Sequence, residues 1–267
     1  MLSYPNFDPV LVSVYLPRLG EIQLRWYSLM YALGLGALYL FFKRSIRRET
    51  LEITSDQAES VLIAALLGMI VGARLLYVWF YNFTYYAANP TEIIQVWRGG
   101  LAFHGGLIGA WVAIWAYARR RSLGFLNLTD HFSLILPLGL AFGRIGNFVN
   151  GELWGTVTEM PWGMVFPGAG PLPRHPSQIY EALIEGPFLM IFLWVLWRTR
   201  PDKGIVTSWF LIVYGVGRFF CEFFREPDMQ LGPVLGPLTM GQLLSGVMTL
   251  AGTALGGKIY SSGSTRV

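Results

Sequence analysis

Seven long apolar runs divide this chain, and each is long enough, or nearly so, to cross a lipid bilayer. A helix needs roughly 20 apolar residues to span the hydrocarbon core. In lipid, only helices and closed β-barrels satisfy their backbone hydrogen bonds, and these runs are too continuous for barrel strands. The sequence therefore predicts an all-α, polytopic membrane protein. The predicted spans cover residues 26–42, 60–81, 101–118, 131–149, 177–197, 204–224 and 238–256.

The composition agrees with a bilayer protein. Of the 267 residues, 54% are hydrophobic and only 13% are charged, whereas soluble domains average about a quarter charged residues. The net charge of +4 does not indicate nucleic-acid binding, because the basic residues form short clusters between apolar runs. The single cysteine, Cys221, excludes an intramolecular disulfide.

The basic clusters also predict the orientation in the membrane. Lysines and arginines are concentrated after the first, third, fifth and seventh spans, and the opposite side carries fewer of them. Because positive residues favour the cytoplasmic side, we expect an external, periplasmic N-terminus and a cytoplasmic C-terminus. The Gly- and Pro-rich stretch 150–176 then forms a small external cap. We expect one domain over residues 1–267.

A polar motif ends the fourth apolar run, in the sequence Gly-Arg-Ile-Gly-Asn-Phe-Val-Asn-Gly-Glu from 143 to 152. An arginine within a bilayer costs about 2.5–3.5 kcal/mol, so Arg144 marks a functional site by default. Arg144 and Asn147 share a helix face, and the arginine fork suits a phosphate diester. Glu152 follows past Gly151 and is expected to balance Arg144 or to orient it. The alternative is an Arg–Glu pair that only locks helices together.

A second buried arginine lies in the sixth run, where Tyr214, Arg218 and Glu222 follow one another at spacings of four. Two arginines converging on one site suit a phosphate, which accepts hydrogen bonds from both. In the fifth run, Glu181 and Glu185 are like charges one turn apart and require a cation. An arginine from another run would serve, and Arg74 of the second run is the nearest candidate. We expect a structural ion network here rather than direct catalysis.

His104 begins the third span in the sequence Phe-His-Gly-Gly, and it is a candidate general base because histidine titrates near neutral pH. The alternative is a polar side chain that is hydrogen-bonded at a helix end. No acidic cluster for Mg²⁺ and no HExxH zinc motif is found. The GxSxG and GxGxxG motifs are also absent, so we expect no metal and no cofactor.

Together these residues resemble one bacterial family, the phosphatidylglycerol–prolipoprotein diacylglyceryl transferases. The matching blocks are His104-Gly105-Gly106, residues 143–155, residues 175–178 and residues 214–228, so the resemblance covers essentially the whole chain. It implies transfer of the sn-1,2-diacylglyceryl group of phosphatidylglycerol to the lipobox cysteine thiol of a prolipoprotein signal peptide. A thioether forms and glycerol 1-phosphate leaves, in the first step of lipoprotein maturation at the periplasmic face of the bacterial inner membrane.

The resemblance also implies which residues form the site. They are Tyr27, His104, Arg144, Asn147, Glu152, Gly155, Glu181, Tyr214, Arg218 and Glu222. Our hypothesis is that Arg144 and Arg218 hold the phosphate while Glu152 and Glu222 fix their geometry. His104 is the first candidate for activating the thiol.

Two other classes of function remain open to a chain with buried arginines. An anionic-lipid transporter or scramblase would also use them, although such a protein typically shows paired repeats, and none is visible here. A non-catalytic chaperone for lipoprotein precursors would need no phosphate-binding arginine.

Overall fold

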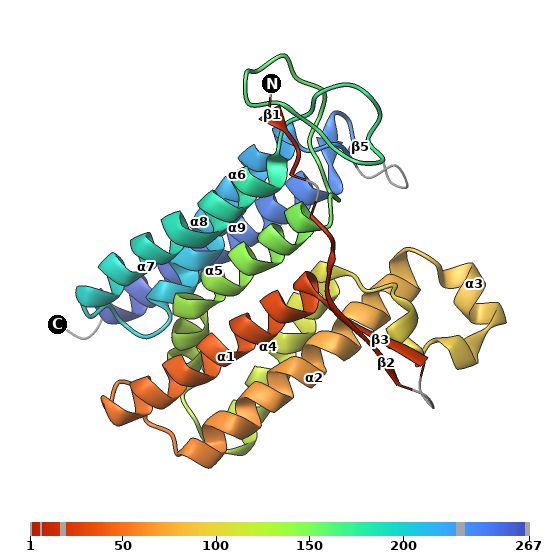
Figure 1. Cartoon of the computed structure of the whole chain (residues 1–267). Helices are drawn as coiled ribbons and strands as arrows, with labels where there is room; N and C mark the ends of the chain where they lie inside the picture. The colour runs from red at the N-terminus through yellow and green to blue at the C-terminus, as the bar shows by residue number, and fades with distance from the viewer. Residues whose placement is uncertain (1, 6, 17–19, 228–232, 265–267) are drawn as a thin grey trace. The chain divides into compact units, whose positions relative to one another are not determined.

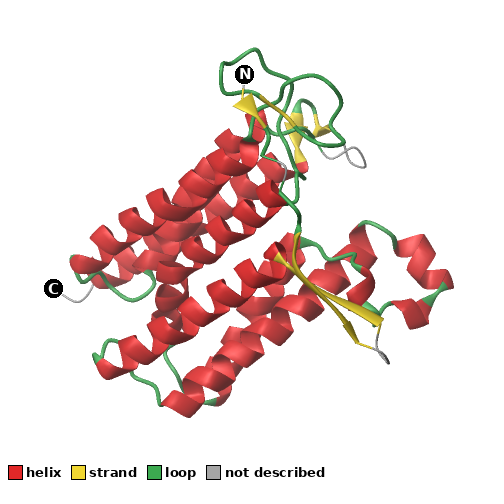
Figure 2. Cartoon of the chain, in the orientation of Figure 1, coloured by secondary structure: helices red, strands yellow, loops and turns green. Residues whose placement is uncertain are grey.

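The computed structural model describes residues 2–5, 7–16, 20–227 and 233–264, and it is mostly helical (Figures 1 and 2). The chain divides into two compact units. The first unit comprises Met1–Leu38 and Phe132–Val267, and the second comprises Tyr39–His131. Two helices, α1 (Trp26–Arg47) and α5 (Phe125–Val149), contribute residues to both units.

The second unit is built around two helices, α2 (Ser55–Phe80) and α4 (Phe103–Arg120), which lie side by side (Figure 1). Between them come α3 (Phe83–Ala88) and the 3₁₀ turns η1 (Pro90–Glu92) and η2 (Val96–Arg98). Thr54 begins α2 with a capping box, in which its side chain accepts from the Gln57 amide while the Gln57 side chain accepts from the Thr54 amide.

Glycines allow a short distance between α2 and α4. A β-carbon at Gly105 would overlap the carbonyl oxygen of Gly72, and one at Gly109 would overlap that of Gly68. Each helix therefore presents a pair of glycines four residues apart to the other, the spacing that lets two membrane helices touch through their backbones. Larger residues at these positions would force the two helices apart.

The first unit contains the remaining helices. They are α6 (Ser177–Leu183), the π-helical turn η3 (Ile184–Phe188), α7 (Leu189–Arg198), α8 (Ile205–Cys221), the 3₁₀ turn η4 (Glu222–Phe224) and α9 (Met240–Ser264). Here α8 and α9 pack closely, and the Ser208 hydroxyl donates to the Gly252 carbonyl over 2.7 Å. A β-carbon at Gly252 would crowd the carbonyl of Ser208, which fixes this close contact.

The described part of the first unit also holds three small β-sheets, which an all-α prediction did not include. β2 (Val10–Leu16) and β3 (Gly20–Arg25) form an antiparallel hairpin, and β1 (Leu2–Ser3) pairs in parallel with β4 (Met164–Val165). β5 (Pro233–Leu235) pairs with β6 (Leu238–Thr239). β1 to β5 lie outside the predicted apolar runs, and β6 occupies the first two residues of the seventh run, 238–256. In these segments, local pairing satisfies the backbone.

Among the described residues, five helices are long and apolar enough to cross a membrane. They are Trp26–Arg47, Ser55–Phe80, Phe125–Val149, Ser177–Arg198 and Ile205–Phe224. These correspond to five of the seven predicted spans. The third and seventh predicted spans do form helices, α4 and α9, but neither is among the five, because glycine and polar residues lower their mean hydropathy.

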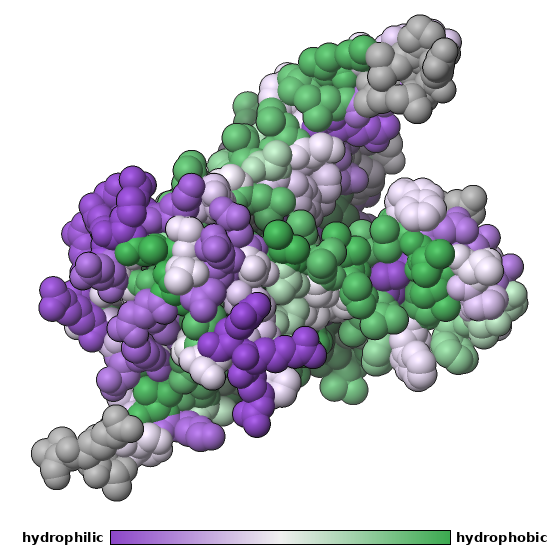
Figure 3. Space-filling model, turned by 90° about the horizontal axis from the view of Figure 1, so that it is seen from below, coloured by the Kyte–Doolittle hydropathy of each residue, from purple (hydrophilic) through white to green (hydrophobic). Residues whose placement is uncertain are grey.

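Apolar side chains cover much of the surface seen in Figure 3, apart from an area where polar side chains gather. On α2, five large apolar residues spaced four apart are all more than half exposed: Ile63, Leu67, Val71, Leu75 and Trp79. A continuous exposed apolar stripe of this length is typical of a helix face that contacts lipid.

Candidate functional site

Three arginines and three glutamates form an ion cluster in the first unit. Arg144, near the end of α5, contacts two carboxylates: its Nη1 lies 2.9 Å from Oε2 of Glu181, and its Nε lies 3.0 Å from Oε2 of Glu185. Nη2 of Arg144 also donates to Oε1 of Glu185 over 3.4 Å, so this pair is bidentate. The predicted Arg144 and Glu181 thus lie together.

Arg218, on α8, joins the same cluster. Its Nη1 donates to Glu181 in a short contact and lies 3.9 Å from Glu185, and its Nη2 lies 2.5 Å from Oε2 of Glu222. The i,i+4 pair with Glu222 therefore forms within α8 and η4, and partners from another helix are present as well. Arg225 adds a third guanidinium, 3.4 Å from Glu181.

The carboxylates lie deeper than the guanidinium groups. The side chains of Glu181 and Glu185 are fully buried, whereas Arg144 keeps 16% of its side-chain surface exposed and Arg218 keeps 12%. A guanidinium carries five N–H donors, and the contacts above leave some donors of both arginines for another acceptor. The cluster can therefore hold an additional anion on its exposed side.

Glu185 is the residue that the sequence analysis left out of the site. It lies in η3, where Gly186 has a non-helical backbone (φ −98°, ψ −105°) and Pro187 removes an amide donor. A π-helical turn inside a longer helix is frequent at functional sites. The like-charge spacing of Glu181 and Glu185 was the sequence signal for it, because such a pair requires nearby cations.

Arg74 is not the cation that neutralises these glutamates, so that prediction was wrong. Arg74 lies in the second unit, where its guanidinium donates to four backbone carbonyls within that unit. Arg144 and Arg218 supply the positive charge at Glu181 and Glu185 instead. The sequence alone gave no means of choosing among the buried arginines.

Glu222 has further support from the start of α9. The Thr239 hydroxyl donates to Oε1 of Glu222 over 3.1 Å, and Gly241 packs directly against the carboxylate. Tyr214, one turn before Arg218 on α8, is buried and stacks on Phe210 with ring centroids 5.7 Å apart. Tyr214 therefore lies on the same helix as Arg218 and one turn from it.

Asn147 and Glu152 form a second polar group beside Arg144. The Asn147 side chain donates to Oε1 of Glu152 over 2.9 Å, and Asn150 donates to the same oxygen over 3.1 Å. Gln178 donates to the Glu152 backbone carbonyl over 2.6 Å. No ion pair between Glu152 and Arg144 occurs among the described residues, so the expected balancing of Arg144 by Glu152 is corrected. Glu181 and Glu185 perform it.

Tyr27, on the first turn of α1, packs against the backbone of α5 at Gly146, where a β-carbon would crowd its ring. Its hydroxyl lies 3.2 Å from that of Tyr31. Tyr27 therefore belongs to the same region as the predicted residues of α5.

Gly155 lies where three chain segments cross, two from the predicted cap at 150–176 and one from η4. Its amide donates to the His175 carbonyl over 2.9 Å, and a β-carbon would overlap the Phe224 carbonyl. Arg174 donates to the Gly155 carbonyl over 3.1 Å and pairs with Glu226 at 2.9 Å. Only glycine fits at this crossing, so close packing explains why position 155 is a glycine.

His175 lies two residues before α6 and is hydrogen-bonded to Tyr180 of that helix, whose hydroxyl lies 3.0 Å from Nδ1. Trp162 donates to the same hydroxyl over 2.6 Å. An indole N–H only donates, so the Tyr180 hydroxyl accepts from Trp162. Burial lowers the pKa of His175. These contacts tie the start of α6 to Trp162.

His104 is the second residue of α4 and is half-buried in the second unit. The nine other predicted residues all belong to the first unit. Asp228, the last residue of the predicted 214–228 block, lies outside the described residues.

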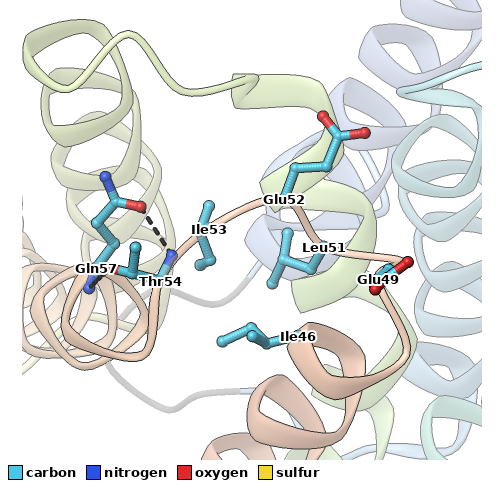
Figure 4. Close-up of a pocket in the computed structure, with 7 residues that line it drawn as sticks. All are labelled: Ile46, Glu49, Leu51, Glu52, Ile53, Thr54 and Gln57. Carbon is cyan, nitrogen blue, oxygen red and sulfur yellow. Dashed lines mark hydrogen bonds between the residues drawn. The ribbon is translucent and has the colours of Figure 1, made fainter.

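A cavity of about 400 Å³ opens in the second unit, where α1 connects to α2 (Figure 4). Its lining includes Glu49, Glu52 and the capping pair Thr54 and Gln57, and it contains none of the predicted site residues. Within the described ranges, no three His, Cys, Asp or Glu side chains are grouped to hold a metal ion.

Comparison with known proteins gives a consistent result. A family model described as prolipoprotein diacylglyceryl transferase matches residues 14–256. Three relatives are named phosphatidylglycerol–prolipoprotein diacylglyceryl transferase. The one from Geobacter sulfurreducens is 46% identical over 95% of this chain and 96% of its own length. That of Pseudomonas aeruginosa is 45% identical (96% and 94% covered), and that of Coxiella burnetii is 49% identical (94% and 95% covered).

Proposed function

The chain belongs to the prolipoprotein diacylglyceryl transferase family, and we propose that it acts on phosphatidylglycerol and on the lipobox cysteine of a prolipoprotein. The cysteine sulfur attacks the glyceryl carbon that carries the phosphate. A carbon–sulfur bond forms, the carbon–oxygen bond breaks, and glycerol 1-phosphate leaves. The thiol proton passes to a base. The product is a diacylglyceryl thioether, in the first step of lipoprotein maturation.

The observation that carries this proposal is the ion cluster of Arg144 and Arg218 above two fully buried glutamates. Negative charge grows on the phosphate ester as the carbon–oxygen bond breaks. Fixed donors aimed at that charge stabilise the transition state more than the ground state, and a low-dielectric site increases the effect. Because Glu181, Glu185 and Glu222 hold the guanidinium groups in place, little reorganisation is needed during the reaction.

Thiol activation requires a base or a nearby cation. A free cysteine has a pKa near 8.5 and is only a few per cent thiolate at neutral pH. His104 is the proposed base, and Tyr214 completes the catalytic group with Arg218 and Glu222. Tyr27, Asn147, Glu152, Gly155 and Glu181 are proposed to bind phosphatidylglycerol around Arg144.

The proposal includes seven membrane spans with a periplasmic N-terminus, a cytoplasmic C-terminus and a periplasmic cap at 150–176. Support comes from α4 and α9, each of which packs along a helix that is apolar enough to span. Both also expose large apolar side chains, namely Ile108 and Val112 on α4 and Val247 and Leu250 on α9. Lipid contact accounts for those exposed residues. The site then lies toward the periplasmic face of the inner membrane.

Thioether formation is the decisive test. Purified protein in detergent is incubated with phosphatidylglycerol and a lipobox peptide, and the peptide is weighed by mass spectrometry. We expect a diacylglyceryl mass increase, which Arg144→Ala loses and which Arg119→Ala retains, because Arg119 is exposed at the far end of α4. A folded, lipid-binding protein that leaves the peptide mass unchanged would contradict the proposal.

In that case the alternative, an anionic-lipid transporter or scramblase, is tested by lipid flux across vesicles. The base is tested separately. His104→Gln is expected to lose turnover, and near-normal turnover in that variant would remove His104 from the catalytic group while leaving the transfer reaction in place.

A further inference from the structure

Arg74 is a buried cation to which the proposed reaction assigns no direct role. Only 4% of its surface is exposed, and its partners within the described residues are carbonyls and a ring, with no carboxylate in an ion pair. The ring is that of Tyr86, which lies 4.9 Å from the guanidinium carbon. A cation without a counter-ion at such depth needs several strong acceptors, so its placement is specific.

Those acceptors come from two turns of the segment that leads into α4. Nη2 and Nε donate to the carbonyls of Glu92 and Ile93 over 2.7 and 2.8 Å, at the end of η1. Nη1 donates to the carbonyls of Gly99 and Gly100 over 2.6 and 3.1 Å, just after η2. Carbonyls at the end of a helical turn lack backbone donors, and one planar guanidinium supplies donors to both turns.

The two glycines fit this role. Gly99 has φ +84° and Gly100 has φ +73°, the left-handed region that glycine adopts without strain. A β-carbon at Gly100 would crowd both the Tyr77 ring and Nη1 of Arg74. The backbone at 99–100 therefore wraps directly onto the guanidinium.

The start of α4 is fixed from the same part of α2. Ala102, its N-cap, has no capping side chain, but its amide donates to the Ala73 carbonyl over 3.0 Å. Gly105 lies against Gly72 through backbone contact. Consecutive residues 72, 73 and 74 thus hold the chain immediately before and after His104.

From this geometry we infer that Arg74 is a positioning residue for His104. Its guanidinium binds the 92–100 segment to α2 and so determines the position of His104 at the start of α4. This inference rests on the proposed function only for its effect on turnover. A displacement of about 1 Å of a catalytic group costs up to about 100-fold in rate. Lysine offers three donors on one nitrogen and cannot reach carbonyls of two turns.

The test combines kinetics with a local probe. In Arg74→Lys, we expect kcat to fall between about 10-fold and 100-fold, while KM for the lipobox peptide stays within about threefold. The chain has three histidines, so protein carrying ¹³C-labelled histidine gives three ring signals, and His104→Gln identifies that of His104. We expect Arg74→Lys to move that signal and to leave those of His131 and His175 in place. Arg119→Lys is the matched control and moves none.

Two kinds of outcome would overturn the inference. The first is a folded Arg74→Lys protein with unchanged kcat and an unchanged His104 signal. The second is an unfolded variant, or one in which all three signals move, since Arg74 would then stabilise the unit as a whole. The signals need no turnover, so an inactive wild-type protein would refute the proposed function and leave this test intact.

A second variant separates the guanidinium fork from its charge. Arg74→Ala is assayed with added methylguanidinium or methylammonium ions, which carry equal charge. Recovery of kcat and of the His104 signal with methylguanidinium alone would support the inference. Equal recovery with both ions would overturn it, because a point charge would then suffice.

Discussion

The two units of this protein bury arginines in different ways. In the first unit, Arg144 and Arg218 are paired with the carboxylates of Glu181, Glu185 and Glu222. In the second unit, Arg74 is held by four backbone carbonyls and an aromatic ring. Both arrangements compensate a charge that is costly in an apolar environment.

The difference determines what each arginine is able to do. A carboxylate partner is a side chain, so a substrate anion is able to share or replace its contacts. A backbone carbonyl is part of the fold, and exchanging it requires the chain to move. We therefore associate the carboxylate-paired arginines with binding and the carbonyl-bound arginine with architecture.

The largest expected effect tests whether the charge of Arg144 in the first unit is compensated by carboxylate side chains. Arg144→Met leaves two glutamates short of a partner and should lower the free energy of unfolding by about 3–5 kcal/mol. Adding Glu185→Met removes the unpaired charge and should restore most of that stability, because well-packed apolar residues often replace a buried ion pair without loss. Thermal unfolding in detergent measures both variants.

Activity should separate from stability in these variants. Transfer to a lipobox peptide should stay about 100- to 1,000-fold below wild type in the double variant, since the guanidinium that donates to the phosphate is absent. Arg74→Met in the second unit has no such compensating change, because its acceptors are main-chain carbonyls. A fully active Arg144→Met/Glu185→Met protein would break the comparison.

In the second unit, α2 and α4 contact each other through their backbones, so this contact should tolerate little added volume. Gly109→Ala places a β-carbon on the Gly68 carbonyl and should cost about 1–3 kcal/mol in unfolding free energy through overpacking. Gly139→Ala in the first unit meets open space and should be neutral or slightly stabilising, as alanine favours helix. Equal unfolding temperatures of the two variants would show that α2 and α4 are not in direct backbone contact at Gly68 and Gly109.

A smaller effect is expected for the side-chain network beside Arg144. Asn147 and Glu152 share a hydrogen bond to a charged acceptor, so Asn147→Ala and Glu152→Ala should couple by about 0.5–1.5 kcal/mol in a double-mutant cycle. Chemical unfolding of the four proteins gives the coupling energy. Strict additivity would mean that this bond contributes nothing in solution.

The smallest effect concerns His175, in the segment 150–176 that we propose as a cap outside the membrane spans. Burial lowers the pKa of His175 below its usual value near 6.5, so the unfolded chain binds a proton more readily than the folded one. Stability from His175 is therefore complete above pH 6.5 and falls as the pH drops through that value toward the lower folded-state pKa. Unfolding temperatures between pH 7.5 and pH 5 should decline slightly less in His175→Gln. Parallel pH profiles would contradict this.

Much of the candidate site was accessible from residue types and spacing. A buried Arg144, a Tyr214-Arg218-Glu222 face and an unfavourable Glu181–Glu185 pair all point to an ionic site, because isolated charges in apolar runs need partners. The pairing itself was not accessible. Glu152 is close enough to Arg144 in the sequence to be its partner, but it accepts hydrogen bonds from Asn147 and Asn150 instead. Arg144 pairs with Glu181 of α6 and Glu185 of η3.

The fold shows the same division. Apolar length predicted the helices, including α4 and α9, because lipid leaves the backbone few alternatives. Strand pairing in the connecting segments was not predicted, and neither was the π-helical break at Gly186, since a proline within an apolar run only suggests a kink.

The sequence by itself determined that this protein is a helical membrane protein of its family with buried arginines. Hydrophobic length and charge cost act residue by residue and leave a readable pattern. Only the tertiary structure decided which carboxylate each arginine pairs with, that Glu185 belongs to the cluster, and that Arg74 binds carbonyls instead. Those choices depend on which helix faces meet, and the contacts join residues about 20 to 40 positions apart in the chain.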